Sequence, residues 1–432
     1  MDDLWIVLPH LGAGGAQKVG LLAAEHFAAQ GLRVRVLSLR PDHPIKHRLP
    51  ENVTVLDIGS EVDALHPWLR DGWNRSFWAR LRRFTVAQLL KLQRLLMRLL
   101  TVAYLGGLQL VSSWVGDVLQ PREGGRLYSW LDRCMAVVGG ERYRRLRDLL
   151  RTERPKRVLA LLSKTNILCC AAAWDLPIHV VVSERNDPRL QRMEMLWRWL
   201  RCLCYRRADV VTANTDGVLK ALQPMGAWTR LELLPNPLPS GVGHTDANGG
   251  LVRTREILAV ARLVPQKGLD VLLHSFAQLP QVVRAGWRVT LVGDGPERDR
   301  LEDLAQTLGL ADVVVFEGFR SDPLAFMQRA SIFALPSRFE GMPNALLEAM
   351  AAGLPAVVTD ASPGPLEMVT DQIHGLVVPR NNPSCFAEAL KCLIQSPELR
   401  VNYGQAAQSK LRSLDWSVVE PHWRSVLALP PL

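Results

Sequence analysis

Hydrophobic runs of strand length recur along the first half of the chain, and helical periodicity follows them. Residues 4–8 (LWIVL) precede a glycine-rich turn, a helical stretch at 17–30 and the run LRVRVLSL. Four later apolar runs predict further strands, at 157–163, 177–183, 208–214 and 231–236. Because strands that alternate with helices over short loops favour a parallel sheet, this half is predicted to be a doubly wound α/β domain.

The second half repeats the same pattern after a change in composition. Residues 240–254 (SGVGHTDANGGLVRT) have the composition of a linker. Five strand-like runs follow, each with a helical stretch behind it: EILAVARL, WRVTLVGDG, DVVVFEGF, SIFALPS and PAVVTD. The pattern predicts a second doubly wound domain, with a ligand in the cleft at the carboxyl ends of the strands.

The segment from about 61 to 155 fits neither sheet and predicts a basic helical insertion in the first domain. It mixes tryptophans and arginines with the leucine-rich run VAQLLKLQRLLMRLL. Two interpretations stay open: an interfacial helix on an anionic membrane, where each nearby basic residue adds about 1 kcal/mol, or an insertion that packs on its own domain. A bilayer span is disfavoured, because residues 101–119 include Gly106-Gly107 and Asp117. Nucleic acid is not expected as a partner, since no binding motif is present.

Composition supports this division. The 432 residues are 48% hydrophobic and 22% charged, enough for two cores. The net charge is +10, and residues 61–155 hold 17 Lys/Arg against 9 Asp/Glu, so most of the excess is local. Seven cysteines in mostly apolar runs suggest buried thiols of a reducing compartment. The start MDDLWIVLPH has no cationic signal-peptide region, which predicts a cytoplasmic protein.

The most informative motif is RFEGMPNALLEAMAAGLP, in which seven residues separate Glu340 from Glu348. A helix is expected to begin near Asn344, so one carboxylate lies on a turn and the other about one turn into the helix. The backbone N–H groups of 341–345 would then face a phosphate, and Glu348 would accept hydrogen bonds from neutral hydroxyls beside it. Alternatively, the acids only stabilise the helix dipole, without any ligand.

Other predicted strand ends carry groups that suit the same ligand. The turn HLGAGGAQK lets the backbone approach a ligand closely, although it lacks the dinucleotide-binding spacing. Arg262 and Lys267 flank a helix start and could neutralise a diphosphate. Taken singly, the glycine-rich sequence is equally consistent with an ordinary turn, and Arg262 and Lys267 with a solvated pair of cations. Together they converge on one crevice, with further turn residues at Gly12, Gly14, Gly15, Gly293, Gly295, Gly318, Phe319 and Arg320.

These motifs resemble a known family. ARLVPQKG, LVGDGPERDRLEDLAQTLGL, VVFEGF and RFEGMPNALLEAMAAGLPAVVTD are similar to the C-terminal domain of family 4 glycosyltransferases, which are retaining GT-B enzymes marked by Glu, seven residues and Glu. GGAQK, VVVSERNDP and LLPNP resemble the N-terminal domain. The resemblance covers most of the chain except 61–155. It implies an N-terminal domain over 1–239, a nucleotide-sugar domain over 255–410, and a last helix at 411–432 that returns to the first domain.

The resemblance also implies roles for individual residues. Arg262 and Lys267 would bind the donor diphosphate, Glu348 would hold the ribose hydroxyls, and Glu340 would face the sugar and the reacting centre. The remaining predicted contacts are the backbone of Gly341, Met342, Pro343 and Asn344 beside the phosphates, Gly293 in the same site, Phe319 and Arg320 at the base, and Gly14 and Gly15 closing on the diphosphate.

One position departs from the family. Many members carry a His at the end of a central N-terminal strand, where this chain has Ser163, Lys164 and Thr165. That departure leaves the donor-sugar contacts of the first domain open, and it makes Glu184 and Arg185 candidates for acceptor contacts.

The function expected is retaining transfer of a sugar from a nucleotide-diphosphate sugar, with a UDP-sugar favoured over a GDP-sugar, to a saccharide or lipid-linked saccharide acceptor. A D-x-D motif is absent from the sequence, and no metal or other cofactor is predicted. Synthesis of lipid-linked glycan or surface polysaccharide would place the protein on the inner face of the cell membrane. The alternatives are a sugar-nucleotide hydrolase or epimerase on the same fold, and a non-catalytic membrane-associated binding subunit.

Overall fold

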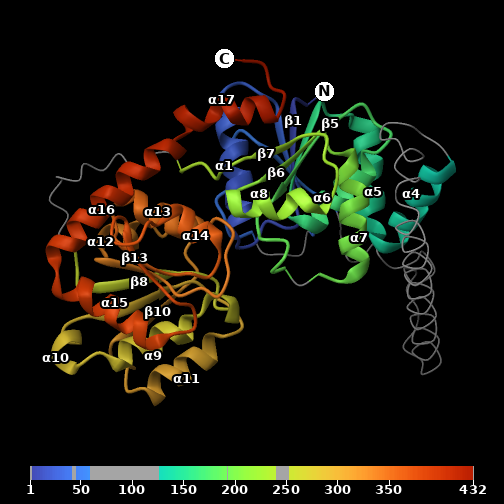
Figure 1. Cartoon of the computed structure of the whole chain (residues 1–432). Coiled ribbons are helices and arrows are strands. Elements are labelled where there is room, and N and C mark those ends of the chain that lie inside the picture. Colours follow the sequence, from blue (N-terminus) through green and yellow to red (C-terminus); the bar gives the residue numbers. More distant parts are fainter. Residues whose placement is uncertain (1, 41–44, 59–125, 192, 240–252, 432) are drawn as a thin grey trace, which may run out of the picture.

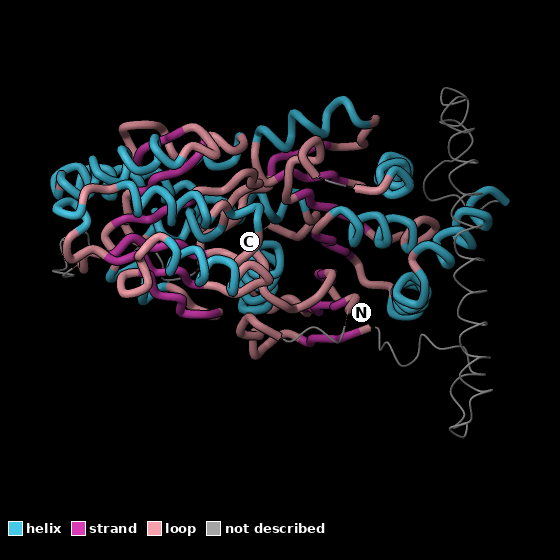
Figure 2. The backbone as a smooth tube through the Cα atoms, turned by 90° about the horizontal axis from the view of Figure 1, so that it is seen from below, coloured by secondary structure: helices cyan, strands magenta, loops and turns pink. Residues whose placement is uncertain are grey.

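Two α/β lobes make up the chain in the computed structural model, which describes residues 2–40, 45–58, 126–191, 193–239 and 253–431 (Figure 1). Within these ranges the N-terminal lobe holds a seven-stranded parallel sheet in the order β3-β2-β1-β4-β5-β6-β7, and the C-terminal lobe a six-stranded parallel sheet in the order β10-β9-β8-β11-β12-β13. In each lobe the helices lie on both sides of the strands (Figure 2). The predicted fold class, two doubly wound domains, is confirmed.

The N-terminal sheet contains every strand that the hydrophobic runs predicted. Its strands are β1 (Leu4–Leu8), β2 (Val34–Ser38), β3 (Thr54–Asp57), β4 (Arg157–Leu161), β5 (His179–Glu184), β6 (Val210–Ala213) and β7 (Leu231–Leu233). The edge strand β3 was not predicted, because its four residues are half-exposed and carry no apolar run. The helices are α1 (Gly15–Ala29), α4 (Arg126–Val138), α5 (Gly140–Glu153), α6 (Ser163–Ala172), α7 (Met195–Cys204) and α8 (Asp216–Leu222).

The C-terminal sheet likewise contains the five predicted strands and one more. Its strands are β8 (Glu256–Val260), β9 (Arg288–Val292), β10 (Val314–Gly318), β11 (Ile332–Leu335), β12 (Ala356–Thr359) and the unpredicted edge strand β13 (Gly375–Val378). Its helices are α9 (Leu269–Gln278), α10 (Gln281–Arg284), α11 (Arg298–Thr307), α12 (Leu324–Arg329), α13 (Asn344–Ala351), α14 (Pro363–Met368), α15 (Pro383–Gln395) and α16 (Pro397–Leu411).

The last helix, α17 (Trp416–Val426), leaves the C-terminal lobe and lies beside α1 of the N-terminal lobe (Figure 1). Trp416 and Trp423 pack edge-on and tilted against Phe27. Glu420 accepts one hydrogen bond from Gln30, at 2.7 Å, and contacts His26 at 2.9 Å. The buried tryptophans belong to the hydrophobic core of the N-terminal lobe, so α17 links the C-terminal lobe to that core.

Helices α4 and α5 are the described part of the predicted insertion. Tyr143, Leu146 and Leu150 on α5 are fully buried in the core under the N-terminal sheet. Residues 126–153 therefore pack on their own domain. The rest of the insertion, including the run proposed to meet a membrane, lies outside the described residues. Among the helices of the described ranges, none combines the length and the apolar character that a membrane crossing needs.

The cysteine prediction holds only in part. Cys134, Cys169, Cys170 and Cys204 are buried free thiols, but Cys202 and Cys392 are exposed. The prediction that all seven are buried was wrong because Cys202 and Cys392 lie on amphipathic helices, α7 and α15, whose outer faces interrupt the apolar pattern.

Arg207 is a buried cation that holds several loops of the N-terminal lobe. Its guanidinium donates to the carbonyls of Ala173, Leu176 and Ile178 at 2.8–2.9 Å and to the carboxylate of Asp209 at 3.1 Å. An Arg207→Met variant should lose about 3 kcal/mol of unfolding free energy, because it leaves these acceptors unpaired in the interior. Denaturant unfolding would measure this loss. The neighbouring Arg206→Met is the matched control, with a change expected within about 0.5 kcal/mol.

Candidate active site

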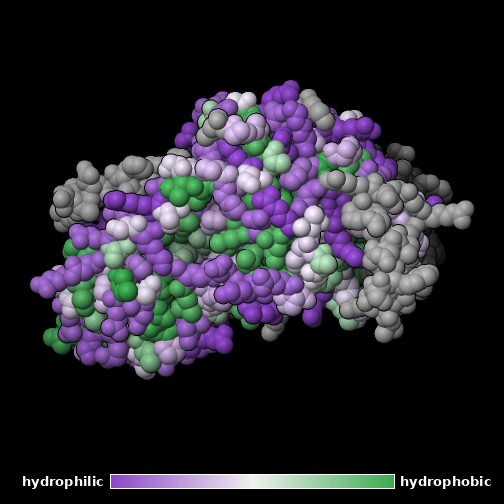
Figure 3. All heavy atoms as spheres, turned by 45° about the horizontal axis from the view of Figure 1, so that its top comes forward, coloured by the Kyte–Doolittle hydropathy of each residue, from purple (hydrophilic) through white to green (hydrophobic). Residues whose placement is uncertain are grey.

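A cleft between the lobes is lined by the carboxyl ends of strands from both sheets. On the face drawn in Figure 3, hydrophilic residues cover most of both lobes, and hydrophobic residues appear between the lobes and in patches on the C-terminal lobe. Of the residues for which the sequence predicted a site role, Gly12, Gly295, Gly318 and Glu184 do not line this cleft. The predicted donor-site residues that line it are Gly14, Gly15, Arg262, Lys267, Gly293, Phe319, Arg320, Glu340, Gly341, Met342, Pro343, Asn344 and Glu348.

Glu340 and Lys267 form an ion pair at the floor of the cleft. Glu340 follows β11 on a short loop and is 6% exposed. Its Oε1 lies 2.5 Å from Lys267 Nζ and accepts a hydrogen bond from Ser337 Oγ at 2.7 Å. Lys267 ends a 3₁₀ turn before α9, where Gly268 has φ 61° and approaches the Pro336 carbonyl so closely that a Cβ would lie 2.1 Å from its oxygen. The close approach of these two turns brings the pair together.

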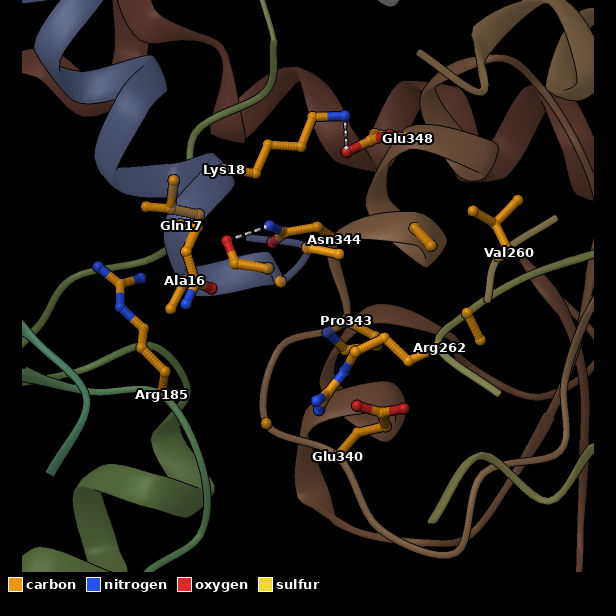
Figure 4. Close-up of a pocket in the computed structure, with 18 of the residues that line it drawn as sticks. Ala16, Gln17, Lys18, Arg185, Val260, Arg262, Glu340, Pro343, Asn344 and Glu348 are labelled. Carbon is orange, nitrogen blue, oxygen red and sulfur yellow. Dashed lines mark hydrogen bonds and ion pairs between the residues drawn. The ribbon is translucent and has the colours of Figure 1, made fainter. Parts of the chain in front are cut away.

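Arg262 adds a second positive charge on the same wall. It follows β8 directly, and its side chain is exposed in the cleft. Among the described residues, its guanidinium has no hydrogen-bond or ion-pair partner, and it extends between Pro343 and Glu340 (Figure 4). A free guanidinium beside Lys267 provides donors for an anionic group.

The amino end of α13 lies in the same lobe as these cations and lines the same cleft. The Glu340 N–H donates to Ser362 Oγ at 2.9 Å, which fixes the turn before the helix. At the first helical position, Asn344 Nδ2 donates to the Gly15 carbonyl at 2.8 Å, and Asn344 Oδ1 accepts a hydrogen bond from Asn236. The N–H groups of a helix start have no partner within the helix and carry partial positive charge. The arrangement suits an anion held between Lys267, Arg262 and the helix start.

Glu348 lies one turn further along α13 and is 6% exposed. Its Oε1 is 2.7 Å from the Nζ of Lys18, which extends from α1 of the other lobe (Figure 4). Burial raises the pKa of the Glu348 carboxyl above its ordinary value, and the Lys18 ammonium opposes that rise. Lys18 was not among the predicted site residues. Its position in GGAQK, in the first turn of a helix behind a glycine loop, was the available signal.

The glycine turn and the predicted base site meet through His47. The His47 ring contacts the Gly14 carbonyl at 3.2 Å and lies edge-on to the Phe319 ring, with centroids 6.3 Å apart. Lys46 Nζ is 5.2 Å from the centroid of Phe319. Burial, followed by the charge of Lys18, lowers the pKa of His47, which favours the neutral form of this imidazole. His47 and Lys46 were not predicted as site residues, because they lie in an irregular segment without a motif.

Three other predicted turn residues, Gly293, Arg320 and Gly12, differ in their positions relative to the cleft. Gly293 has φ 145°, and a Cβ at this position would lie 1.8 Å from the Ala261 carbonyl oxygen. Arg320 pairs with Glu317 at 2.9 Å at the rim. Gly12, by contrast, is not among the cleft residues, and its N–H donates to the His10 ring at 3.1 Å.

Glu184 and Arg185 were the candidates for acceptor contacts, and of these two only Arg185 lines the cleft. Arg185 is 6% exposed, its guanidinium donates to Asn236, and burial lowers its pKa to about 9. Glu184 turns the other way, where it accepts hydrogen bonds from Tyr205 (2.5 Å) and Ser163 (2.7 Å). The structure does not bring Glu184 to the cleft, because successive side chains of a strand point to opposite faces of the sheet. Lys164 Nζ lies over the Trp197 ring, 5.0 Å from its centroid.

The described part of the chain contains no group of three or more His, Cys, Asp or Glu side chains that could hold a metal ion.

Comparison with known proteins identifies both lobes. Residues 248–410 match the family model described as glycosyl transferases group 1, and residues 106–237 match the glycosyl transferase 4-like domain. The lobes and the cleft between them have the GT-B architecture. Each lobe therefore matches a domain model of glycosyltransferases, and the two lobes together have the GT-B fold.

Two similar proteins match the sequence of this chain over part of their length. The chain is 36% identical over 202 residues to the exopolysaccharide phosphotransferase SCO2592 of Streptomyces coelicolor, covering 46% of this chain and 21% of that protein. It is 27% identical over 244 residues to the N-acetylgalactosamine-N,N'-diacetylbacillosaminyl-diphospho-undecaprenol 4-alpha-N-acetylgalactosaminyltransferase of Campylobacter jejuni, covering 55% and 66%. The chain thus spans between a fifth and two thirds of the length of these relatives.

Among solved structures, the Anabaena protein HepE in complex with UDP superimposes with a TM-score of 0.67. The alignment covers 99% of this chain and all of HepE at 17% sequence identity, so the likeness concerns the fold.

Proposed function

We propose that this protein is a retaining glycosyltransferase of family 4 type, which moves a sugar from a nucleotide-diphosphate sugar to an acceptor hydroxyl. The observation that carries the proposal is the group formed by Lys267, Arg262 and the amino end of α13 around one point of the cleft, with Glu340 beside it. A binding module would have less need of so concentrated a positive site next to a buried carboxylate.

The transfer would proceed through an oxocarbenium-like state in which the bond between the sugar and the diphosphate breaks. Negative charge grows on the diphosphate, and preorganised cations and N–H dipoles stabilise that charge without reorganising. Lys267 and Arg262 would supply the charges, and the start of α13 the dipoles. The acceptor hydroxyl attacks from the face that the diphosphate leaves, and its proton passes to a diphosphate oxygen, so configuration is retained.

Residues on both lobes would hold the rest of the donor. Glu348 would accept hydrogen bonds from the ribose hydroxyls, and Gly14 and Gly15 would close on the diphosphate. The base would lie against the backbone at Phe319 and Arg320. A UDP-sugar is favoured as donor, and the UDP named for the neighbouring HepE structure supports this choice.

The acceptor is proposed to be a growing polysaccharide or a lipid-linked saccharide. The names of the Streptomyces and Campylobacter relatives refer to an exopolysaccharide and to a diphospho-undecaprenol saccharide. The local excess of positive charge at 61–155 would suit anionic lipids, which gives a peripheral location on the inner face of the cell membrane. Arg185, on the acceptor side of the cleft, is the candidate for an acceptor contact.

Ligand binding and product stereochemistry test this proposal directly. UDP-sugars should raise the melting temperature of the purified chain more than GDP- or ADP-sugars, since a ligand at 100 times its Kd adds about 2.7 kcal/mol. NMR of the product formed with an acceptor should then show the donor's anomeric configuration. Product formed only by water attack or by epimerisation would favour the hydrolase or epimerase alternative. Binding without turnover for any acceptor would favour the non-catalytic subunit.

A further inference from the structure

The contact between Lys18 and Glu348 joins the two lobes inside the cleft. Lys18 lies on α1 of the N-terminal lobe, and Glu348 on α13 of the C-terminal lobe. Their side chains are 22% and 8% exposed, so water screens the pair only weakly. Lys18 Nζ contacts Oε1 of the carboxylate, as the dashed line in Figure 4 marks. Among the described residues, no side chain or backbone group donates to Oε2.

A buried carboxylate can bind neutral hydroxyls well only while it is ionised. An ionised carboxylate accepts on both oxygens, whereas a protonated one loses acceptor capacity to its own O–H. Burial of Glu348 favours the protonated form, and the negative charge of Asp322 acts in the same direction. Of the charged groups near Glu348, Lys18 is the one that favours the ionised form. The two charges come from different lobes, so this support exists only when the lobes are closed.

We propose that Lys18 is a positioning residue for the donor: it keeps the Glu348 carboxylate ionised and oriented, so that the ribose of the nucleotide binds tightly only in the closed cleft. This inference rests on the proposed function, which assigns the ribose hydroxyls to Glu348. Lys18 occupies Oε1 and leaves Oε2 for the ligand. Ribose binding and lobe closure then favour each other, because each is stronger when the other is present. Closure also brings Gly14 and Gly15 to the diphosphate.

A nucleotide that lacks the ribose hydroxyls separates this role from a direct contact with phosphate. Binding of UDP and of 2′,3′-dideoxy-UDP would be measured by calorimetry for wild type and for Lys18→Met. The expected result is a loss of about tenfold in UDP affinity, as for one charge-assisted hydrogen bond, and a change of less than about twofold for the dideoxy analogue. Lys18→Arg should recover most of the affinity, and Glu348→Gln should reproduce the selective loss.

The pH dependence gives a second readout. As the pH falls, Glu348 becomes protonated and the preference for UDP over the dideoxy analogue is lost. Without Lys18 the pKa of Glu348 rises further, so Lys18→Met should lose this preference at a higher pH than wild type does. Using the ratio of the two nucleotides cancels titration of the phosphates, which both share.

Lys156→Met is the matched control. Lys156 pairs with Asp3 at 2.8 Å, close to the 2.7 Å of the Lys18 pair, but far from the cleft at the other end of the sheet. Its UDP affinity should equal that of wild type. An equal loss of UDP and dideoxy-UDP binding in Lys18→Met, or no loss at all, would overturn the inference while leaving the proposed function standing. A wild-type protein that binds neither nucleotide would overturn both.

Discussion

Replacing Lys267 with alanine should lower kcat at saturating donor by on the order of a hundredfold or more. The ammonium is fixed in place by Glu340 at 2.5 Å, next to the free guanidinium of Arg262 and the start of α13. It would therefore be aligned with the leaving diphosphate before the reaction begins. Losing one preorganised charge removes stabilisation that water cannot replace within a closed cleft. Steady-state kinetics with the donor identified by thermal shift would measure the effect.

Two variants make the Lys267 result specific. Lys267→Arg keeps a positive charge and should recover part of the rate, although its planar fork matches the ammonium position imperfectly. Lys391→Ala removes a surface lysine that pairs with Glu388 on α15 and should be as active as wild type. If Lys267→Ala turned over like wild type, Lys267 would have no part in the mechanism.

A second large loss of activity is expected for Gly341→Ala, because the added methyl group should push the two lobes apart. A Cβ at position 341 would lie 2.0 Å from the carbonyl oxygen of Arg185, at the end of β5 in the N-terminal lobe. Backbone groups on both sides cannot move aside at low cost, so the cleft must open. A displacement of about 1 Å between catalytic groups costs about a hundredfold in rate, and kcat/KM should fall by that order.

Gly309→Ala provides the control for a glycine substitution in the same lobe. Gly309 has φ 66° with nothing near its missing Cβ, so alanine there adds about 1 kcal/mol of backbone strain and leaves the cleft unchanged. Its melting temperature should fall while kcat/KM stays at the wild-type value. A fully active Gly341→Ala protein would show that catalysis does not need the lobe contact at Arg185.

The sequence predicted which residues of the C-terminal lobe lie together in the cleft, because the determinants of their placement are local. Strand, turn and helix signals follow one another closely around Glu340, Gly341 and Asn344, and the parallel sheet then brings successive strand ends to one edge. The order of the elements alone was enough to place Arg262 and Lys267 beside that motif.

Contacts between the lobes could not be predicted in the same way. Lys18 with Glu348, and His47 with Phe319, join residues that are far apart in the chain, and no periodicity links them. The strand register turned Glu184 away from the cleft, a consequence of side-chain alternation that depends on where the strand begins. The edge strands β3 and β13 are short and half-exposed, so their hydrophobic signal is weak.

A nucleotide diphosphate is expected to bind between the two lobes, against the positively charged wall of the C-terminal lobe. A crystal structure of the protein with its UDP-sugar would test it most directly. Diphosphate oxygens are expected within hydrogen-bonding distance of Lys267, Arg262 and the N–H groups at the start of α13. A diphosphate bound elsewhere, with the side chains of Lys267 and Arg262 turned into solvent, would contradict it.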